Sequence, residues 1–146
     1  MLKEIFGRHP DYVNPDGTKE LPGDIIYCDE RGNYKFSIEV KYCNINFTKR
    51  EYENWIENKS SEKPKYFIAL GKEKIILCDW ESFSKKYKNI QETPVKKYST
   101  RISVDSINTS DGRLQLSTDC VKDRTNTSID SEIFSKLKEW KNKQRL

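Results

Sequence analysis

The chain has 146 residues, a formal net charge of +4 and a hydrophobic fraction of 34%. This length predicts a single domain over residues 1–146, and the six Phe, eight Tyr and three Trp predict an aromatic-rich core. The modest basic excess is compatible with nucleic acid, while the absence of a signal peptide or membrane-spanning segment and of any Cys-x-x-Cys pair predicts a cytoplasmic, reduced protein without a zinc site.

The N-terminal segment predicts a short helix and then a loop. Residues 2–9 carry apolar side chains at helical spacing, and Pro10 ends the pattern. Arg8 lies near the end of this helix and is a candidate phosphate contact. Residues 11–21 contain the turn sequence Asn-Pro-Asp-Gly, so we expect an exposed loop there.

Residues 22–42 predict a β-hairpin. Apolar residues occupy every second position over residues 34–42, which is typical of a strand with one buried face and one polar face. A short apolar run over residues 24–28 predicts the partner strand. Between the two, Arg31-Gly32 suits a two-residue turn.

This turn determines which side chains face each other. Opposed residues then have numbers that sum to 63, which places Asp24 opposite Glu39, with Lys41 on the same face. Two bare carboxylates about 5 Å apart repel each other by on the order of 3 kcal/mol at an effective dielectric constant of about 20. We therefore expect one of the two acids to titrate with a raised pKa, and a divalent cation between them would reverse the repulsion.

Two acids and a lysine on one face fit the hydrolysis of a phosphodiester. Mg²⁺ prefers carboxylate and carbonyl oxygens and usually keeps several waters. Lys41 is then placed to hold or activate one of those waters for in-line attack. The alternative is that Asp24, Glu39 and Lys41 are the solvated outer face of an amphipathic hairpin.

A helix is expected after the hairpin. Thr48 and Glu51 have the spacing of a capping box, and an apolar stripe continues to about Lys59. Lys49 and Arg50 lie in the first turn and are candidates for binding the DNA backbone. A solvated helix start explains either residue equally well.

The middle of the chain predicts two buried strands and a helix. Residues 65–70 and 74–79 are continuous apolar runs, as in strands that are covered on both faces. Residues 80–88 have aromatic side chains at spacings of three and four, which predicts a helix. The order of hairpin, helix, strand, strand and helix indicates an α/β (α+β) fold with a mixed central sheet flanked by helices.

The C-terminal part, about residues 95–146, predicts accessory elements. Residues 101–107 and 113–118 alternate polar and apolar positions around a turn sequence, which predicts a second β-hairpin. A helix with a basic outer face is expected from about residue 128. The fold class is therefore completed by a C-terminal β-hairpin and helix.

The first hairpin resembles the PD-(D/E)XK nuclease superfamily, which includes restriction endonucleases and Holliday-junction resolvases. The resemblance covers about residues 20–90. The matching residues are an acid followed by two apolar residues and a triplet preceded by an apolar residue, Asp24-Ile25-Ile26 and Ile38-Glu39-Val40-Lys41. One departure is that Gly23 precedes the first acid where the family has proline, and Pro22 stands one place earlier.

The resemblance implies a restriction endonuclease-like core in which Asp24 and Glu39 bind Mg²⁺, for which Mn²⁺ can substitute. It further implies that the Val40 carbonyl completes the metal site and that Lys41 is the catalytic lysine. Many members have an accessory acid on a helix before the first motif, for which Glu4 is the candidate; a solvated helix acid is the alternative.

The expected activity is a Mg²⁺-dependent endonuclease that acts on DNA without an organic cofactor, either as a restriction-type enzyme or as a junction resolvase. Cutting both strands of a duplex or a junction normally requires two sites, so we expect a homodimer. A second possibility is a catalytically idle nuclease fold that binds nucleic acid or a protein partner and needs no metal. A third is a structural or inhibitory protein without salt-dependent DNA binding.

Overall fold

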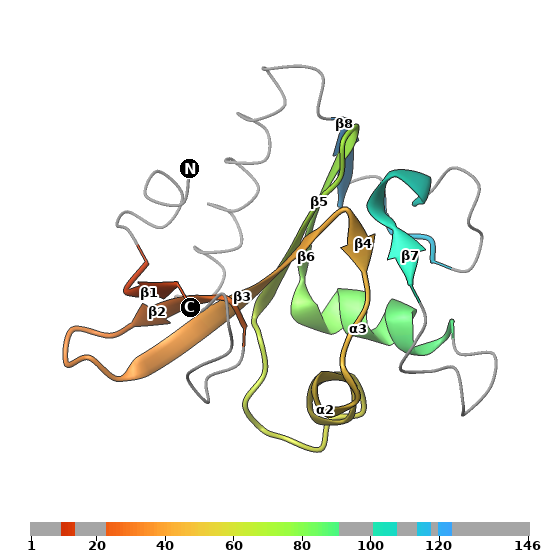
Figure 1. Cartoon of the computed structure of the whole chain (residues 1–146). Coiled ribbons are helices and arrows are strands. Elements are labelled where there is room, and N and C mark those ends of the chain that lie inside the picture. Colours follow the sequence, from red (N-terminus) through yellow and green to blue (C-terminus); the bar gives the residue numbers. More distant parts are fainter. Residues whose placement is uncertain (1–9, 14–22, 91–100, 108–113, 118–119, 124–146) are drawn as a thin grey trace.

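The computed structural model describes residues 10–13, 23–90, 101–107, 114–117 and 120–123 (Figure 1). The helical segments are α2 (Lys49–Glu51), the π-helical turn η1 (Tyr52–Ile56), α3 (Trp80–Lys88) and the 3-10 turn η2 (Val104–Ser106). The strands are β1 (Tyr12–Val13), β2 (Ile25–Cys28), β3 (Tyr34–Tyr42), β4 (Asn44–Ile45), β5 (Tyr66–Leu70), β6 (Lys74–Asp79), β7 (Ile102–Ser103) and β8 (Val121–Asp123).

These elements form a mixed α+β structure around one mixed sheet, as the sequence predicts. The strand order is β1-β2-β3-β5-β6-β8, with four longer strands in the centre, and β4 pairs with β7 in a second, two-stranded sheet. β3 and β5 are parallel, whereas the other neighbouring pairs are antiparallel. Figure 1 shows α2 and α3 on one side of the central strands.

The β2–β3 hairpin confirms the predicted register where the acids lie. Ile25 pairs with Ile38, and Ile26 pairs with Ser37, so the residue numbers of each pair have the predicted sum. The next residues outward along this ladder are Asp24 and Glu39. The two acids therefore stand at facing positions of neighbouring strands.

The predicted two-residue turn is wrong. The Asp29 carbonyl accepts the Gly32 N–H, and the Asp29 N–H donates to the Asn33 carbonyl, so three residues lie between Asp29 and Asn33. Gly32 has φ +83°, which favours glycine. A β-bulge at Lys35 then adds one residue to β3 and restores the predicted register beyond it.

β3 is buried on both faces, which corrects the expectation of one solvated polar face. Ser37 and Glu39 are 0% and 3% exposed. Glu39 is paired with Phe67 of β5, which belongs to the main core between the sheet and the helices. The opposite face packs a smaller cluster around Ile38, Tyr66 and other apolar residues. The helices cover the face of β3 that carries the acid.

The helices agree closely with the sequence pattern. The Thr48 hydroxyl accepts the Glu51 N–H and the Glu51 carboxylate accepts the Thr48 N–H, which confirms the capping box. The helix continues into the π-helical turn η1, which ends at Ile56. Asn58 has a φ of +60°, which a right-handed helix cannot accommodate. The helix therefore ends slightly before the predicted end at about Lys59. The prediction for α3 is confirmed over its full length.

The predicted second hairpin is wrong. β7 pairs with β4 instead of with residues 113–118, and residues 114–117 are not in a strand. Asp105, in the turn after β7, accepts the backbone N–H groups of Lys72, Glu73 and Lys74 in the β5–β6 turn. These bonds hold residues 101–107 against the main sheet and prevent a continuous strand there.

Two further expectations concern the remaining segments. Tyr12–Val13 pairs with β2, so part of the predicted loop over residues 11–21 is a strand. The helices expected over residues 2–9 and from residue 128 lie outside the described residues, and so do Glu4 and Arg8.

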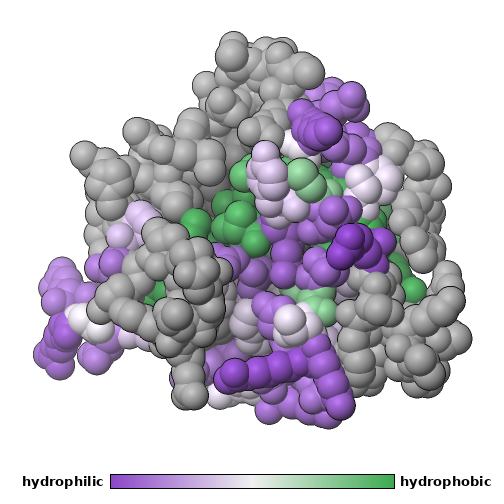
Figure 2. Space-filling model, in the orientation of Figure 1, coloured by the Kyte–Doolittle hydropathy of each residue, from purple (hydrophilic) through white to green (hydrophobic). Residues whose placement is uncertain are grey.

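The surface of the described residues is largely hydrophilic in the view of Figure 2, with smaller apolar areas between charged side chains. Tyr42, at the end of β3, is the one large hydrophobic side chain that is classed as exposed among them, at 69%. None of their helices combines the length and apolar character needed to cross a membrane.

Candidate active site

Asp24 is bound to β3 at two points that flank Glu39. Its backbone N–H donates to the Ile38 carbonyl at 2.9 Å. Its Oδ2 accepts the Val40 N–H at 2.8 Å. The carboxylate of Asp24 is therefore fixed in position by the strand that carries the second acid.

Gly23, which precedes Asp24, has a backbone conformation that proline could not adopt. Its φ is +90°, whereas the ring of proline fixes φ near −65°. A Cβ at this position would lie 2.9 Å from Ser37 Oγ and 3.0 Å from the Ile38 carbonyl oxygen. Glycine is thus required for the chain to bring Asp24 this close to β3.

Glu39 is a buried acid with an unusual electrostatic environment. Among the described residues nothing donates a hydrogen bond to its Oε2. Burial, followed by the hydrogen bond to Asp24 and the negative charge of Asp24, raises the pKa of Glu39 to about 10, against the opposing charge of Lys41. With a pKa this far above neutral, Glu39 holds its proton at neutral pH when no cation is bound.

Lys41 lies beside Glu39 and is held by two contacts. Its Nζ is 4.0 Å from Glu39 Oε1 and 4.5 Å from the centre of the Phe47 ring. The side chain of Lys41 is only 15% exposed. The ammonium group therefore has a defined position against an aromatic face, next to the acid pair.

The Val40 carbonyl lies on the β2 side of β3, the side on which Asp24 is bound. The N–H and C=O of one strand residue project to the same side, and the Val40 N–H is bound to Asp24. Ser37, three residues earlier in β3, instead accepts the Lys65 N–H with its carbonyl, on the β5 side. The Val40 carbonyl oxygen is therefore on the β2 side of β3, level with residues that precede the first residue of β2.

This donor set fits a hard divalent cation. Asp24 and Glu39 supply carboxylate oxygens, Glu39 Oε2 lacks a donor, and the Val40 carbonyl is directed to the same side. Within the described ranges, no cluster of three or more His, Cys, Asp or Glu side chains is suited to a metal ion. A cation at the pair would therefore take most of its remaining ligands from water or substrate, as Mg²⁺ does.

Some predicted residues are near the pair and others are not placed. Lys49 and Arg50 are exposed in the first turn of α2. The charge of Glu51, in the same turn, also contributes to the raised pKa of Glu39, which shows that this turn lies close enough to act on the acids. The sequence pattern predicts a capping role for Glu51 and no role for Phe47, because nothing in the order of apolar and polar residues places either of them beside the hairpin.

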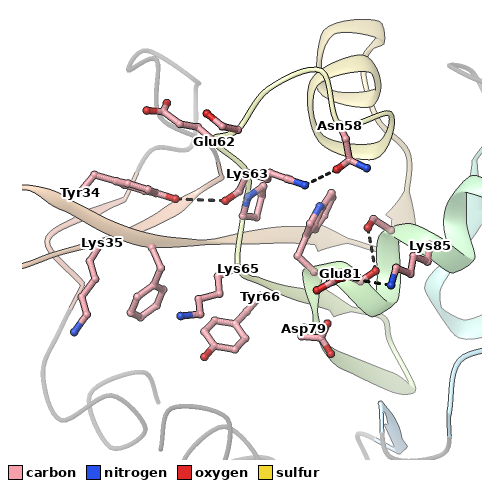
Figure 3. Close-up of a pocket in the computed structure, with 15 residues that line it drawn as sticks. Tyr34, Lys35, Asn58, Glu62, Lys63, Lys65, Tyr66, Asp79, Glu81 and Lys85 are labelled. Atoms are coloured by element: carbon pink, nitrogen blue, oxygen red, sulfur yellow. Dashed lines mark hydrogen bonds and ion pairs between the residues drawn. The ribbon is translucent and has the colours of Figure 1, made fainter. Parts of the chain in front are cut away.

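An open pocket of about 770 Å³ lies at a different place in the sheet. It is lined by the start of β3, the loop before β5 and the start of α3, and neither acid nor Lys41 belongs to its lining (Figure 3). The acid pair is better supported as a centre of chemistry, since it combines a buried carboxyl group, one oxygen of which has no hydrogen-bond partner among the described residues, with a fixed ammonium group.

Comparison of the chain with protein-family models, with curated proteins and with solved structures finds no match in any of the three. The assignment of a function therefore depends on the arrangement of the residues themselves.

Proposed function

We propose that the chain is a Mg²⁺-dependent endonuclease of the PD-(D/E)XK type that hydrolyses phosphodiester bonds of DNA. The observation that carries this proposal is the pair formed by the buried Glu39 and the partly buried Asp24, with the Lys41 ammonium group beside it. Fold stability alone does not require this arrangement, because burying an acid next to another acid is unfavourable.

In this proposal Asp24, Glu39 and the Val40 carbonyl hold the cation. When bound, Mg²⁺ supplies positive charge for the phosphodiester and makes a water molecule more acidic. Glu39 must give up its proton before it can act as a ligand. The bond from the Val40 N–H keeps Asp24 in place throughout, so the site needs little rearrangement.

Lys41 positions the attacking water in this mechanism. Its Nζ has three N–H donors, and the contacts with Glu39 and the Phe47 ring restrict where they can point. A water held there is ready for in-line attack on a phosphodiester, and the same ammonium group stabilises negative charge that develops on the phosphate. Lys49 and Arg50, exposed nearby, would contact the DNA backbone.

Restriction-type cleavage and junction resolution both follow from this chemistry, and each requires two sites. A homodimer that acts on DNA in a reducing, cytoplasmic compartment is therefore part of the proposal.

The alternative function is a nuclease fold with idle acids that binds nucleic acid or a protein partner. It is favoured by the 3% exposure of Glu39 and by a lysine-lined pocket that does not include the acids. Such a module would bind its partner equally well without a divalent cation.

The test is cleavage of linear duplex, single strand, nicked circle and four-way junction in Mg²⁺ or EDTA. We expect the wild-type protein to cut at least one substrate in Mg²⁺ only, and Lys41→Ala to lose at least about a hundredfold in rate because the water is no longer positioned. Lys88→Ala, which removes an exposed lysine of α3, is the matched control and should cut normally. Binding of DNA without cleavage by the wild type would favour the idle module, and equal rates for Lys41→Ala and Lys88→Ala would exclude the role of Lys41.

A further inference from the structure

The open pocket lies where the β2–β3 hairpin extends beyond the start of β5. Four lysines contribute to its lining, namely Lys35, Lys63, Lys65 and Lys85. Partly buried aromatic side chains, Tyr34 and Phe36, form part of the wall on the hairpin side. The pocket thus combines these four lysines and three acids, Glu62, Asp79 and Glu81, with aromatic surface, although none of its residues has a role in the proposed hydrolysis.

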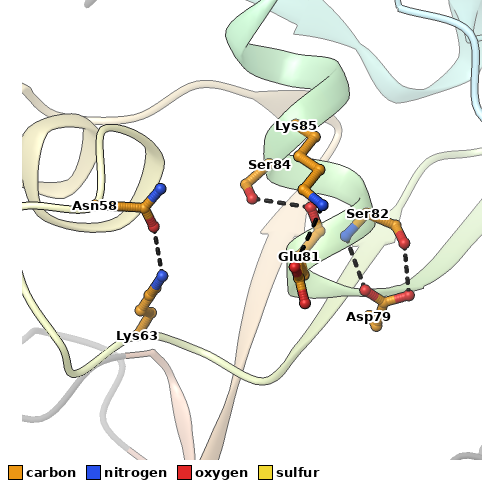
Figure 4. A network of polar contacts seen from close by, with 7 residues as sticks. All are labelled: Asn58, Lys63, Asp79, Glu81, Ser82, Ser84 and Lys85. Atoms are coloured by element: carbon orange, nitrogen blue, oxygen red, sulfur yellow. Dashed lines mark hydrogen bonds and ion pairs between the residues drawn. The ribbon is translucent and has the colours of Figure 1, made fainter.

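Most charged groups of the pocket already have partners. Lys63 donates to the Asn58 side chain, and Lys85 is paired with Glu81 at 3.3 Å (Figure 4). The Asp79 carboxylate accepts the backbone N–H and the hydroxyl of Ser82 at the start of α3. Asp79, Glu81 and Lys85 form the α3 side of the pocket, and Asn58 and Lys63 belong to the segment between η1 and β5.

Lys35 and Lys65 are different. Their side chains form no ion pair or hydrogen bond within the described part of the chain, and they point to the same side of the strands in Figure 3. The Lys65 Nζ lies 5.7 Å from the centre of the Phe36 ring. The bulge explains the position of Lys35, because a bulge places two successive side chains on the same face.

The two lysines act on each other unfavourably. Burial and the positive charge of Lys35 lower the pKa of Lys65. An anion between the two ammonium groups would remove this repulsion. A phosphate group is the anion that matches an open pocket with two separate cations, because each of its oxygens accepts hydrogen bonds.

We propose that the pocket between Lys35 and Lys65 binds phosphate groups of a nucleic-acid strand, as a second contact site apart from the acid pair. This inference rests on the proposed function. Lys35 precedes Glu39 by four residues in β3, or about 13 Å along the strand, and the bulge places the two side chains on opposite faces of β3, so the pocket is a contact site separate from the acid pair. The partly exposed Tyr34 ring adds a surface on which a base can stack.

The experiment compares two double variants that each remove two positive charges. Lys35→Gln/Lys65→Gln changes the pocket, and Lys86→Gln/Lys88→Gln changes exposed lysines of α3 that do not line it. Affinity for a fluorescein-labelled single-stranded DNA oligonucleotide is measured in EDTA over a range of salt concentrations. We expect the pocket variant alone to bind about tenfold or more weakly, with a salt slope that is smaller by about two.

A second readout follows Lys65 directly. The ¹³Cε signal of Lys65 is titrated against pH with and without the oligonucleotide, and in a parallel series with inorganic pyrophosphate. We expect the oligonucleotide to raise the pKa of Lys65, since a phosphate favours the charged form. If the double pocket variant does not fold, Lys35→Gln alone changes an exposed side chain, and its slope should fall by about one.

The outcomes separate the two proposals. Equal loss of affinity in the pocket and control variants would overturn the pocket, even if Mg²⁺-dependent cleavage is observed. Pocket-dependent binding without any cleavage would support the pocket and overturn the nuclease. A response of Lys65 to pyrophosphate but not to the oligonucleotide would overturn the nucleic-acid assignment and identify small phosphate compounds as the ligands.

Discussion

The placement of Glu39 is energetically unfavourable in the metal-free fold. Its carboxyl group is removed from water, stands beside Asp24 and has an oxygen without a donor among the described residues. Holding a proton is the available way to reduce this cost when no cation is present. A cation would replace that proton. The same burial that destabilises the acid thus prepares it to bind metal.

We expect the stability of the metal-free protein to depend on this proton. Between the ordinary pKa of a glutamate and the raised pKa of Glu39, the folded chain holds a proton that the unfolded chain has released. The free energy of unfolding should therefore fall as pH rises through this window, by at most about 1.4 kcal/mol per pH unit. Glu39→Gln mimics the protonated acid and should remove this fall, as measured by urea denaturation in EDTA.

Glu81→Gln is the control for this measurement, because Glu81 is exposed on α3 and its loss should leave the pH dependence intact. Curves for the wild type and Glu39→Gln that stay parallel from about pH 5 to about pH 9 would show that Glu39 titrates normally.

The facing of Asp24 and Glu39 was predictable, but the burial of Glu39 was not. Alternation in residues 34–42 identifies two faces of a strand and fixes their register against the partner. It does not say which face the helices will cover. In the structure the helices pack over the polar face of β3, because Phe67 and other residues distant in the sequence form the main core on that side. Phe47 was missed beside Lys41 for the same reason.

Gly32 and Gly23 lie at opposite ends of the β2–β3 hairpin and have different structural roles. Gly32 has a positive φ in an open turn, where a Cβ would meet nothing within 4 Å. Gly23 has a similar φ, but a Cβ there would press on Ser37 and the Ile38 carbonyl. The first glycine serves the turn alone, whereas the second also determines how closely Asp24 approaches β3.

We expect Gly32→Ala to lose about 1 kcal/mol of unfolding free energy and to bind Mg²⁺ as the wild type does, because only backbone strain is introduced. Gly23→Ala should lose about 2–4 kcal/mol, since crowding adds to the strain, and its Mg²⁺ affinity should fall. Thermal unfolding and Mg²⁺ titration of both variants check this. Equal losses of stability with unchanged Mg²⁺ affinity would contradict the role given to Gly23.

The elements with the strongest local sequence patterns have the boundaries that the sequence predicts. β5, β6 and α3 have long apolar runs or clear helical spacing, and all three lie where the sequence predicts them. The bulge at Lys35 has no such signal, and it compensated for a turn that was predicted one residue too short. Residues 101–107 show weak alternation, and their partners turned out to be β4 and the β5–β6 turn. Short strands are determined by tertiary contacts of this kind.

In the whole molecule, β3 connects the two candidate sites. Its second half carries Glu39 and Lys41, and its beginning carries Lys35 in the pocket. A rigid central strand suits both, because residues on it keep a fixed spacing while loops differ.

Binding of Mg²⁺ with release of a proton tests most directly whether the acid pair is a cation site. Calorimetric titration near neutral pH, in buffers of different ionisation enthalpy, gives both the affinity and the number of protons released. We expect one Mg²⁺ per chain and close to one proton per ion, because Glu39 must lose its proton, and we expect Asp24→Asn to abolish binding. No binding at millimolar Mg²⁺, or equal binding by Asp24→Asn, would contradict the site.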